Sequence, residues 1–167
     1  MGTSTEMVPR MTLRDGVGWA EFSPDERSIA ASGMAGHAAV WDARTGEKRF
    51  DLRTLEFLVS QIHFRPDGRE LLTANADNLT AARAARRWNA ETGAEILPAL
   101  WHRDGMICAR YDASGRLVAS GGEDNLARVW NADTGRPVTP FLVHQGYVVD
   151  VAFSSDGRRV ATASNDR

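Results

Sequence analysis

The sequence lacks several features that would direct it out of the cytoplasm or onto nucleic acid. A single cysteine, Cys108, excludes a disulfide within the chain. No apolar run approaches the roughly 20 residues that a membrane-spanning helix needs, and the first residues lack the apolar stretch of a secretory signal. With 20 basic and 22 acidic residues the net charge is −2, so no overall field attracts nucleic acid or a membrane. We therefore expect a cytoplasmic protein with neither of these partners.

The common catalytic and metal-binding motifs are also missing. There is no HExxH pair, no glycine-rich phosphate loop ending in Lys-Ser/Thr, and no pair of cysteines at metal-ligand spacing. Cys108 lies in an apolar strand pattern, where core packing explains it better than a role as nucleophile. We expect no catalytic residues, no metal, no cofactor and no enzymatic activity within this chain.

What the sequence does contain is a series of short alternating strands separated by turns. Between Gly105 and Gly135, three such strands are predicted at Met106–Tyr111, Leu117–Ser120 and Leu126–Trp130. Each strand ends at a cluster of Gly, Asp, Asn or Ser, the residues that favour tight turns. This pattern predicts an antiparallel meander.

The same unit recurs along the chain. The aromatic residues that end each first strand are 42, 47 and 42 residues apart: Phe22, Phe64, Tyr111 and Phe153. The third-strand tryptophans are 47 and 42 residues apart: Trp41, Trp88 and Trp130. The second copy therefore carries a five-residue insertion between Phe64 and Trp88. A period near 42 made of short strands is typical of β-propeller blades rather than helical solenoids.

A fourth strand is expected after the Thr-Gly pair that ends each third strand. The predicted positions are 48–53, 94–100 and 137–143, and a further strand is expected at 6–13, before the first copy. The count is then 15 strands, and no segment has a convincing helical period.

These repeats resemble the blades of WD-repeat (WD40) β-propellers. The resemblance lies in the segment Val129–Gly135, the Ser23-Pro24-Asp25 turn and the Ser120–Asp124 loop, and it extends over residues 6–167. Thr-Gly-X-Pro and a His before the next copy are similar to bacterial repeats. The resemblance implies an all-β fold of four-stranded antiparallel blades in one WD-repeat region, 1–167.

The resemblance also implies approximate units at 5–42, 47–89, 94–131 and 137–167, of which the last is truncated. About three and a half blades cannot close a ring, and open sheet edges would be left unpaired. We therefore expect an open propeller. A fragment of a longer protein is the favoured explanation, and self-association through open blade edges is the alternative.

In this family four side chains often lock a blade: His after the fourth strand, Ser or Thr on the second, Asp in the following turn and Trp on the third. A buried Asp must be hydrogen-bonded, and these groups can bond in a chain. The resemblance implies this structural role for His102, Ser120, Asp124 and Trp130; for His144, Thr162 and Asp166; for Thr73, Asp77 and Trp88; and for Trp41 alone in the first copy. Because the set recurs by blade, it indicates a scaffold rather than a hydrolase triad.

We expect the two remaining histidines to lie outside the blade-locking set. His63 alternates with core positions beside Phe64, so we expect it to face outward, and His37 lies in a predicted turn. The first copy keeps only the tryptophan of the locking set, so its blade is expected to be the least rigid.

Two groups of residues are candidates for binding a partner. The resemblance implies a loop face near the channel, formed by Trp101, Arg103, Asp104, Glu123, Gln145, Tyr147 and Asn165. Exposed Trp, Tyr and Arg are enriched at interface hot spots, although Trp101 could equally cap a strand edge. The second group lies in and after the insertion at 78–87: Arg83, Arg86 and Arg87. These arginines could grip an acidic or phosphorylated partner, but a solvated extension is the favoured interpretation.

The function expected from these features is a non-catalytic scaffold that binds protein or peptide partners through its loop face. The alternative is a regulatory or sensing portion of a larger bacterial enzyme, such as a Ser/Thr protein kinase, whose catalytic domain lies outside these residues.

Overall fold

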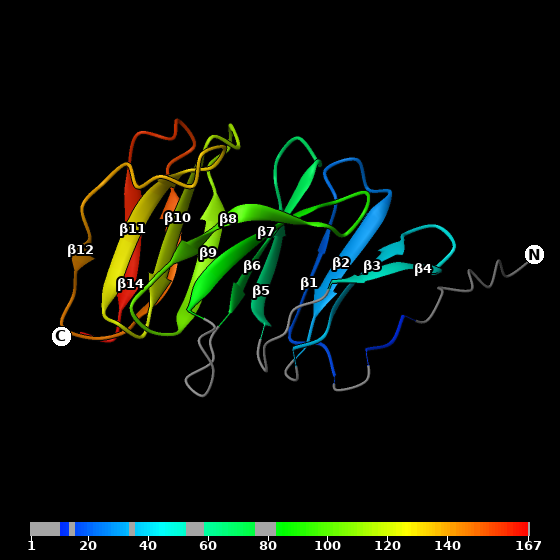
Figure 1. The fold of residues 1–167 in the computed structure, drawn as a ribbon, viewed down its shortest axis with the longest axis horizontal. Helices are drawn as coiled ribbons and strands as arrows, with labels where there is room; N and C mark the ends of the chain where they lie inside the picture. Colours follow the sequence, from blue (N-terminus) through cyan, green and yellow to red (C-terminus); the bar gives the residue numbers. More distant parts are fainter. Residues whose placement is uncertain (1–10, 14–15, 34–35, 53–58, 76–82, 167) are drawn as a thin grey trace, which may run out of the picture.

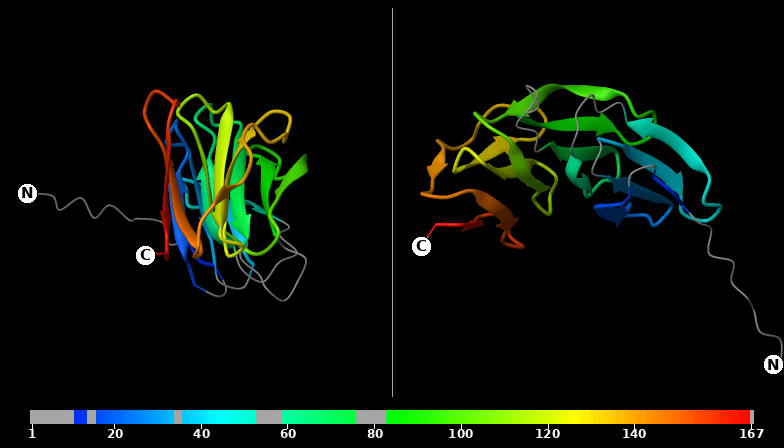
Figure 2. Two further views of the ribbon diagram at one scale, coloured as in Figure 1. Left: turned by 90° about the vertical axis from the view of Figure 1, so that its left-hand side faces the viewer. Right: turned by 90° about the horizontal axis from the view of Figure 1, so that it is seen from below.

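The computed structural model describes residues 11–13, 16–33, 36–52, 59–75 and 83–166. Within these ranges the chain forms fourteen strands and no helix. Three four-stranded antiparallel sheets and one two-stranded sheet follow one another along the chain (Figure 1). Seen from below, they form an open arc, and the described residues do not close a ring (Figure 2). The predicted all-β fold of open, propeller-type blades is confirmed.

The strands pair in chain order within each sheet. The first sheet contains β1 (Trp19–Phe22), β2 (Ser28–Ser32), β3 (Ala38–Asp42) and β4 (Lys48–Leu52). The second contains β5 (Val59–Phe64), β6 (Glu70–Asn75), β7 (Ala84–Asn89) and β8 (Glu95–Trp101). The third contains β9 (Met106–Tyr111), β10 (Leu117–Gly122), β11 (Leu126–Asn131) and β12 (Leu142–Val143). The fourth contains β13 (Val148–Phe153) and β14 (Val160–Ser164).

The sequence repeats and the hydrogen-bonded sheets are offset by one strand. The expected unit 94–131 begins with β8, yet β8 pairs with β7 and is the outer strand of the second sheet. Each sheet therefore takes its fourth strand from the residues that open the next sequence repeat.

The turns form as their residues require. The turn after the first strand contains a left-handed glycine in the later sheets, such as Gly115 with φ 72°, whereas the first sheet has Glu26 there with φ 59°. In the turn after the third strand, the Asn131 side chain accepts a hydrogen bond from the Thr134 backbone N–H at 2.9 Å. An Asx side chain bonding its own backbone in this way stabilises a tight turn.

Two of the expected fourth strands form as predicted, and the third is shorter. β12 covers only Leu142–Val143, whereas a strand was expected from residue 137. Pro137 makes an isolated bridge to Trp130, and the chain then leaves the sheet until Leu142. Pro137 and Pro140 have no N–H to donate to a sheet ladder, which explains the interruption. The strand expected at 6–13 falls mainly outside the described residues, and 11–13 are not in a strand.

Apolar side chains fill the space between successive sheets. Ile62 and Leu71 of the second sheet pack with Val40 of the first. Leu72 and Leu100, on the other side of the second sheet, pack with Val118 and its neighbours in the third. Because each inner sheet is covered on both faces, its second strand, β6 or β10, is buried almost throughout.

The free cysteine belongs to this core. Cys108 packs between the third and fourth sheets with Val148 and Val151. It is fully buried, and burial raises the pKa of its thiol to about 12. The expectation that Cys108 packs in the core is confirmed.

Candidate functional site

The third sheet contains a chain of four bonded side chains. The Trp130 indole N–H donates to Ser120 Oγ at 2.7 Å, and His102 Nε2 lies 2.8 Å from the same oxygen. His102 Nδ1 lies 3.1 Å from both carboxylate oxygens of Asp124. Since a carboxylate accepts, Nδ1 carries the proton and Nε2 accepts from the serine hydroxyl. The hydroxyl thus donates once and accepts once.

Asp124 also joins two loops. Its carboxylate accepts from the backbone N–H of Arg103 at 2.9 Å and of Leu126 at 3.1 Å. The Glu123 N–H donates to the Gly105 carbonyl at 2.8 Å. The loop before β9 and the loop between β10 and β11 are therefore held together at one end of the sheet.

The charge of Asp124 is stabilised by these bonds. Burial disfavours the carboxylate, but the hydrogen bond and charge of His102, with the backbone N–H groups of Arg103 and Leu126, outweigh it. The pKa of Asp124 is consequently lower than its ordinary value.

The fourth sheet repeats part of this arrangement. His144 lies 3.0 Å from Asp166 Oδ2 through Nδ1 and 2.9 Å from Thr162 Oγ1 through Nε2. The Gln145 backbone N–H donates to Asp166 at 3.0 Å, which is the main reason that the pKa of Asp166 is lowered. The Asn165 N–H donates to the Tyr147 carbonyl at 2.9 Å, so two loops are again joined.

The second and first sheets contain fewer of the four blade-locking side chains. The Trp88 indole donates to Thr73 Oγ1 at 3.0 Å, whereas Asp77 lies outside the described residues. In the first sheet Trp41 is buried and packs against Ala31, which stands in the position of the hydroxyl residue.

The joined loops form one end of the molecule, which we call the loop face: residues 101–105, 123–125, 144–147 and 165. They lie along the lower side of Figure 1. Trp101 is 51% exposed and Tyr147 is 50% exposed. The Arg103 guanidinium lies 5.7 Å from the centre of the Phe141 ring and has no carboxylate at ion-pair distance within the described chain. The face therefore offers aromatic rings and one unpaired cation.

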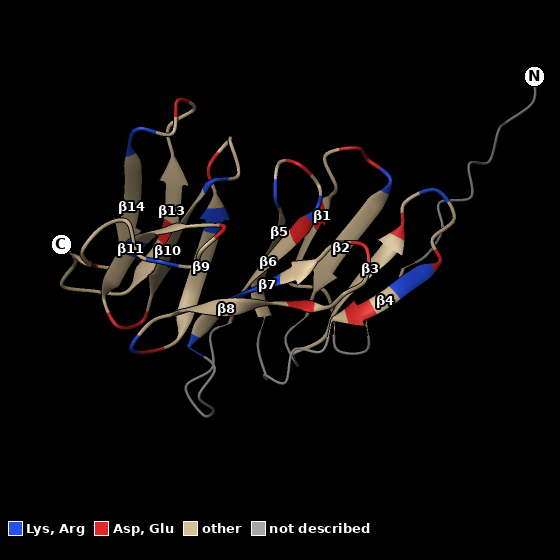
Figure 3. Ribbon diagram, turned by 45° about the horizontal axis from the view of Figure 1, so that its top comes forward, with Lys and Arg blue, Asp and Glu red and all other residues tan. Residues whose placement is uncertain are grey.

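Of the three arginines predicted as a cluster, the structure places one beside this face. Arg83 Nη1 donates to the Arg103 carbonyl at 2.7 Å, and its Nε lies 3.8 Å from Asp104. Arg86 instead pairs with Glu95 at 2.6 Å, across β7 and β8. Figure 3 shows acidic and basic residues interspersed over the described sheets rather than gathered on one side.

The prediction that Arg87 is available to a partner is wrong. Arg87 is 1% exposed, donates to the Ala132 carbonyl and lies 3.7 Å from Glu70. It is part of β7 rather than of a loop, and alternate side chains of a strand point to opposite faces. Arg87 directly precedes Trp88, and the other copies have Val40 and Val129 at this position. Alignment of the copies therefore predicts that Arg87 belongs to the strand.

The prediction that His63 faces outward is also wrong. Its Nδ1 lies 2.6 Å from Glu21 Oε2, and it is 8% exposed. The Trp19 ring packs edge-on at 5.1 Å. The first strands of successive sheets lie side by side. A side chain on β5 that points away from its own sheet therefore contacts the adjacent sheet. His37, in contrast, lies outside the strands, just before β3.

Sequence reasoning missed a partly buried charged network between the second and third sheets. Glu70 accepts from Arg65 at 2.9 Å and from the Tyr111 hydroxyl at 3.2 Å, and Arg65 also pairs with Asp133 at 2.9 Å. Burial, reinforced by the charge of Glu70, raises the pKa of Tyr111 above its usual range. Alignment of the copies contains a signal for this network. Charged residues, Arg65, Glu70 and Arg87, stand at positions where the first copy has Ser23, Ser28 and Val40.

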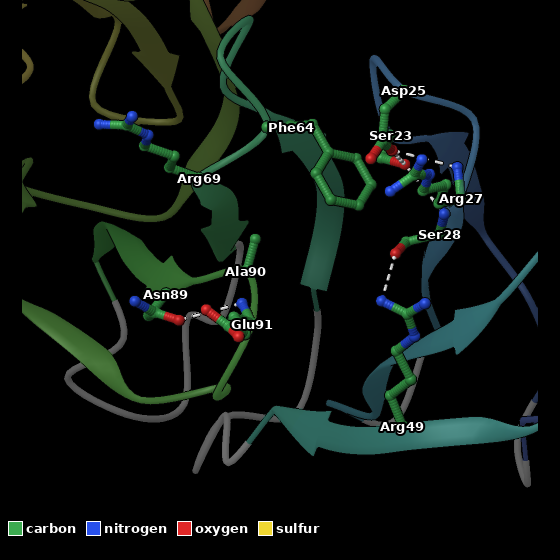
Figure 4. Close-up of a pocket in the computed structure, with 11 residues that line it drawn as sticks. Ser23, Asp25, Arg27, Ser28, Arg49, Phe64, Arg69, Asn89, Ala90 and Glu91 are labelled. Atoms are coloured by element: carbon green, nitrogen blue, oxygen red, sulfur yellow. Dashed lines mark hydrogen bonds between the residues drawn. The ribbon is translucent and has the colours of Figure 1, made fainter.

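At the corresponding place between the first and second sheets there is a cavity of about 530 Å³ (Figure 4). Phe64 and Ala90 line one side, and Ser28 accepts from Arg49 at 3.0 Å on the other. The cavity lies at the opposite end of the sheets from the loop face. In the described residues no three His, Cys, Asp or Glu side chains are placed to hold a metal ion.

Comparison with known families agrees with the fold. The family described as WD40, WD domain, G-beta repeat, matches residues 99–131 and 135–167. No curated protein matches the chain. Residues 99–131 and 135–167 therefore contain WD40 repeats, and the four-stranded antiparallel sheets are consistent with the blades of a partial propeller. Repeats of this class generally mediate protein–protein interaction and are generally non-catalytic. None of the described residues forms a helix long and apolar enough to cross a bilayer.

Proposed function

We propose that this chain is a non-catalytic scaffold that binds a protein or peptide partner through its loop face. The observation that carries this proposal is the exposure of Trp101, at the end of β8, and of Tyr147, beside loops that the Asp124 and Asp166 hydrogen bonds join. An aromatic side chain on a fixed backbone loses little entropy when it is covered, which favours binding. Trp, Tyr and Arg are also the residues that most often supply interface hot spots.

The blade-locking residues have a supporting role in this proposal. His102, Ser120 and Asp124 do not face the partner, because their side chains are buried. They fix the backbone beside Arg103, so that the exposed side chains are presented in one geometry. The same role is proposed for His144, Thr162 and Asp166, and for Thr73 and Trp88.

Two exposed residues of β8 allow a matched test. Trp101 lies on the loop face, whereas Leu97, which is 74% exposed, lies four residues earlier on the same strand. A peptide selected on the immobilised chain should lose at least tenfold in affinity with Trp101→Ala, the loss expected for a hot-spot residue. Leu97→Ala should retain the native affinity.

Thermal melting separates this function from a structural role of Trp101. The proposal requires that both variants have the melting temperature of the native protein. A lowered melting temperature for Trp101→Ala, with the affinity of the folded fraction unchanged, would instead show that Trp101 caps the strand edge. Equal losses of affinity in both variants would show that the peptide does not bind through the loop face.

A further inference from the structure

The cavity between the first and second sheets corresponds to a place that an arginine fills between the second and third sheets. The two turns are 42 residues apart, so Ser23 in the cavity stands where Arg65 stands in the next interface. Three carboxylates hold the Arg65 guanidinium group: Asp67 at 3.4 Å, Glu70 at 2.9 Å and Asp133 at 2.9 Å. We call this arrangement the Arg65 site and the other the Ser23 cavity.

The Arg65 side chain packs closely against the adjacent turn. A Cβ atom added to Gly115 would lie 3.0 Å from Arg65 Nε. Gly68 is the corresponding residue of the Ser23 cavity, and a Cβ atom added there would be 3.8 Å from the nearest described neighbour, Pro24. The cavity of about 530 Å³ therefore includes the space that an arginine side chain takes in the next interface.

Two of the three carboxylates of the Arg65 site are retained around the Ser23 cavity. Asp25 stands in the position of Asp67, and Glu91 stands in that of Asp133. Neither has a cation at ion-pair distance within the described chain. The two hydrogen bonds that Asp25 accepts both use Oδ1, so its Oδ2 is available. Figure 4 shows Asp25 and Glu91 on opposite sides of the Phe64 ring, which lines the cavity.

The basic residues that line the Ser23 cavity do not exclude a further cation. Arg27 and Arg69 correspond to Arg69 and Arg116 of the Arg65 site, where a guanidinium group is bound all the same. The third arginine of the cavity, Arg49, is paired with Asp42 at 2.8 Å. One more guanidinium group is therefore compatible with the charges around the cavity.

We propose that the Ser23 cavity binds an arginine side chain of a partner polypeptide. The guanidinium group bridges Asp25 and Glu91 across the face of Phe64, as Arg65 bridges two turns in the next interface. A planar guanidinium group can donate to two carboxylates and stack on an aromatic ring, which a lysine ammonium group does less well. The cavity exceeds one arginine side chain in volume, which leaves room for the adjoining peptide backbone. This site is separate from the loop face, which lies at the opposite end of the sheets.

The ligand is tested with the capped tripeptide Ala-Arg-Ala, added to the ¹⁵N-labelled chain and followed by NMR. We expect saturable shifts of the backbone N–H signals of residues 25–28 and 89–91, with a dissociation constant of about 1 mM. The citrulline peptide keeps the shape without the charge and should bind about tenfold more weakly. The lysine peptide should bind about threefold more weakly. Free arginine should also bind more weakly than the tripeptide, because it lacks the adjoining peptide backbone.

The protein side of the contact is tested with three variants. Ser23→Arg introduces the residue that the second sheet has at this position, and it should abolish binding by filling the cavity. Glu91→Gln should weaken binding about fivefold. Glu47→Gln removes the same charge from an exposed residue that does not line the cavity, and it should retain the native affinity. Thermal melting identifies any loss of binding that comes from unfolding.

No saturation at about 20 mM peptide, or equal binding of the arginine and citrulline peptides, would overturn the proposal. Native affinity of folded Ser23→Arg or Glu91→Gln would overturn it as well. Equal affinities of free arginine and the tripeptide would overturn the assignment to a polypeptide in favour of the free amino acid. Saturation by inorganic phosphate, without a response to the arginine peptide, would overturn the proposal in favour of an anion site at the arginines of the cavity.

Discussion

The first sheet and the central region of the molecule have the same strand geometry but different side-chain networks. Between the second and third sheets, Arg65, Glu70, Arg87 and Tyr111 form a partly buried charged network. Between the first and second sheets the equivalent positions hold Ser23, Ser28, Val40 and Phe64, and a cavity of about 530 Å³ remains there. The third sheet also has a complete blade-locking set, of which the first retains only Trp41.

This difference shows that the repeat specifies the blade, while each interface between blades is specified by residues outside the repeat pattern. The strands form wherever the alternating pattern and turns recur, in the first sheet as in the third. The network adds a condition, because three of its contacts reach the third sheet: Glu70 with Tyr111, Arg65 with Asp133, and Arg87 with the Ala132 carbonyl. The second and third sheets therefore fit one another more specifically than the first and second do.

The largest expected effect comes from removing Arg87. Arg87→Ala should lower the free energy of unfolding by about 3–5 kcal/mol, because Glu70 and the Ala132 carbonyl lose a buried partner. The measurement is urea denaturation followed by tryptophan fluorescence. Arg86→Ala, the neighbouring variant at the Glu95 pair, is the control and should cost about 1 kcal/mol or less. Equal effects of the two variants would contradict a special role for the interface between the second and third sheets.

Removing Asp124 should have the next largest effect. Asp124→Ala leaves His102 and the N–H groups of Arg103 and Leu126 without their acceptor, and should cost about 2–3 kcal/mol. Asp166→Ala in the fourth sheet should cost less, since its carboxylate is more exposed. If the free energy of unfolding of Asp124→Ala equals that of the native protein within error, the blade-locking set does not order the loop face.

A smaller effect is expected from pH. The folded pKa of Asp124 is below its ordinary value of 3.8, so its contribution to stability is present above about pH 4 and is lost as the pH falls through the folded pKa. The melting temperature of Asp124→Asn should therefore depend less on pH between about 4 and 2 than that of the native protein. Parallel curves for the two proteins would show that Asp124 is not stabilised in the folded state.

The sequence was sufficient for most of the fold because strands and turns depend on local pattern. The strands predicted at 106–111, 117–120 and 126–130 agree closely with β9, β10 and β11, and those predicted at 48–53 and 94–100 agree with β4 and β8. The sequence was insufficient where a single residue overrides the pattern. Pro137 and Pro140 shorten β12, although the Thr-Gly pair before them predicts a full strand.

The side chains at the interfaces were harder to predict, because their partners are distant in sequence. His63 and Glu21 are 42 residues apart, and Arg87 meets Ala132 across 45 residues. Strand alternation placed His63 on the surface and the insertion placed Arg87 there, whereas each has a partner in the adjacent sheet. Alignment of the copies position by position would have placed Arg87 in a strand, but it would not have identified its acceptor.

The most direct test of the proposed scaffold function is hydrogen exchange of the chain with and without a bound peptide selected on it. The account predicts slower exchange at residues 101–105, 123–125 and 144–147, which form the loop face. It predicts unchanged exchange at the turns at the opposite end, 23–27, 65–69 and 112–116. Protection confined to those turns, around the cavity between the first and second sheets, would contradict binding through the loop face.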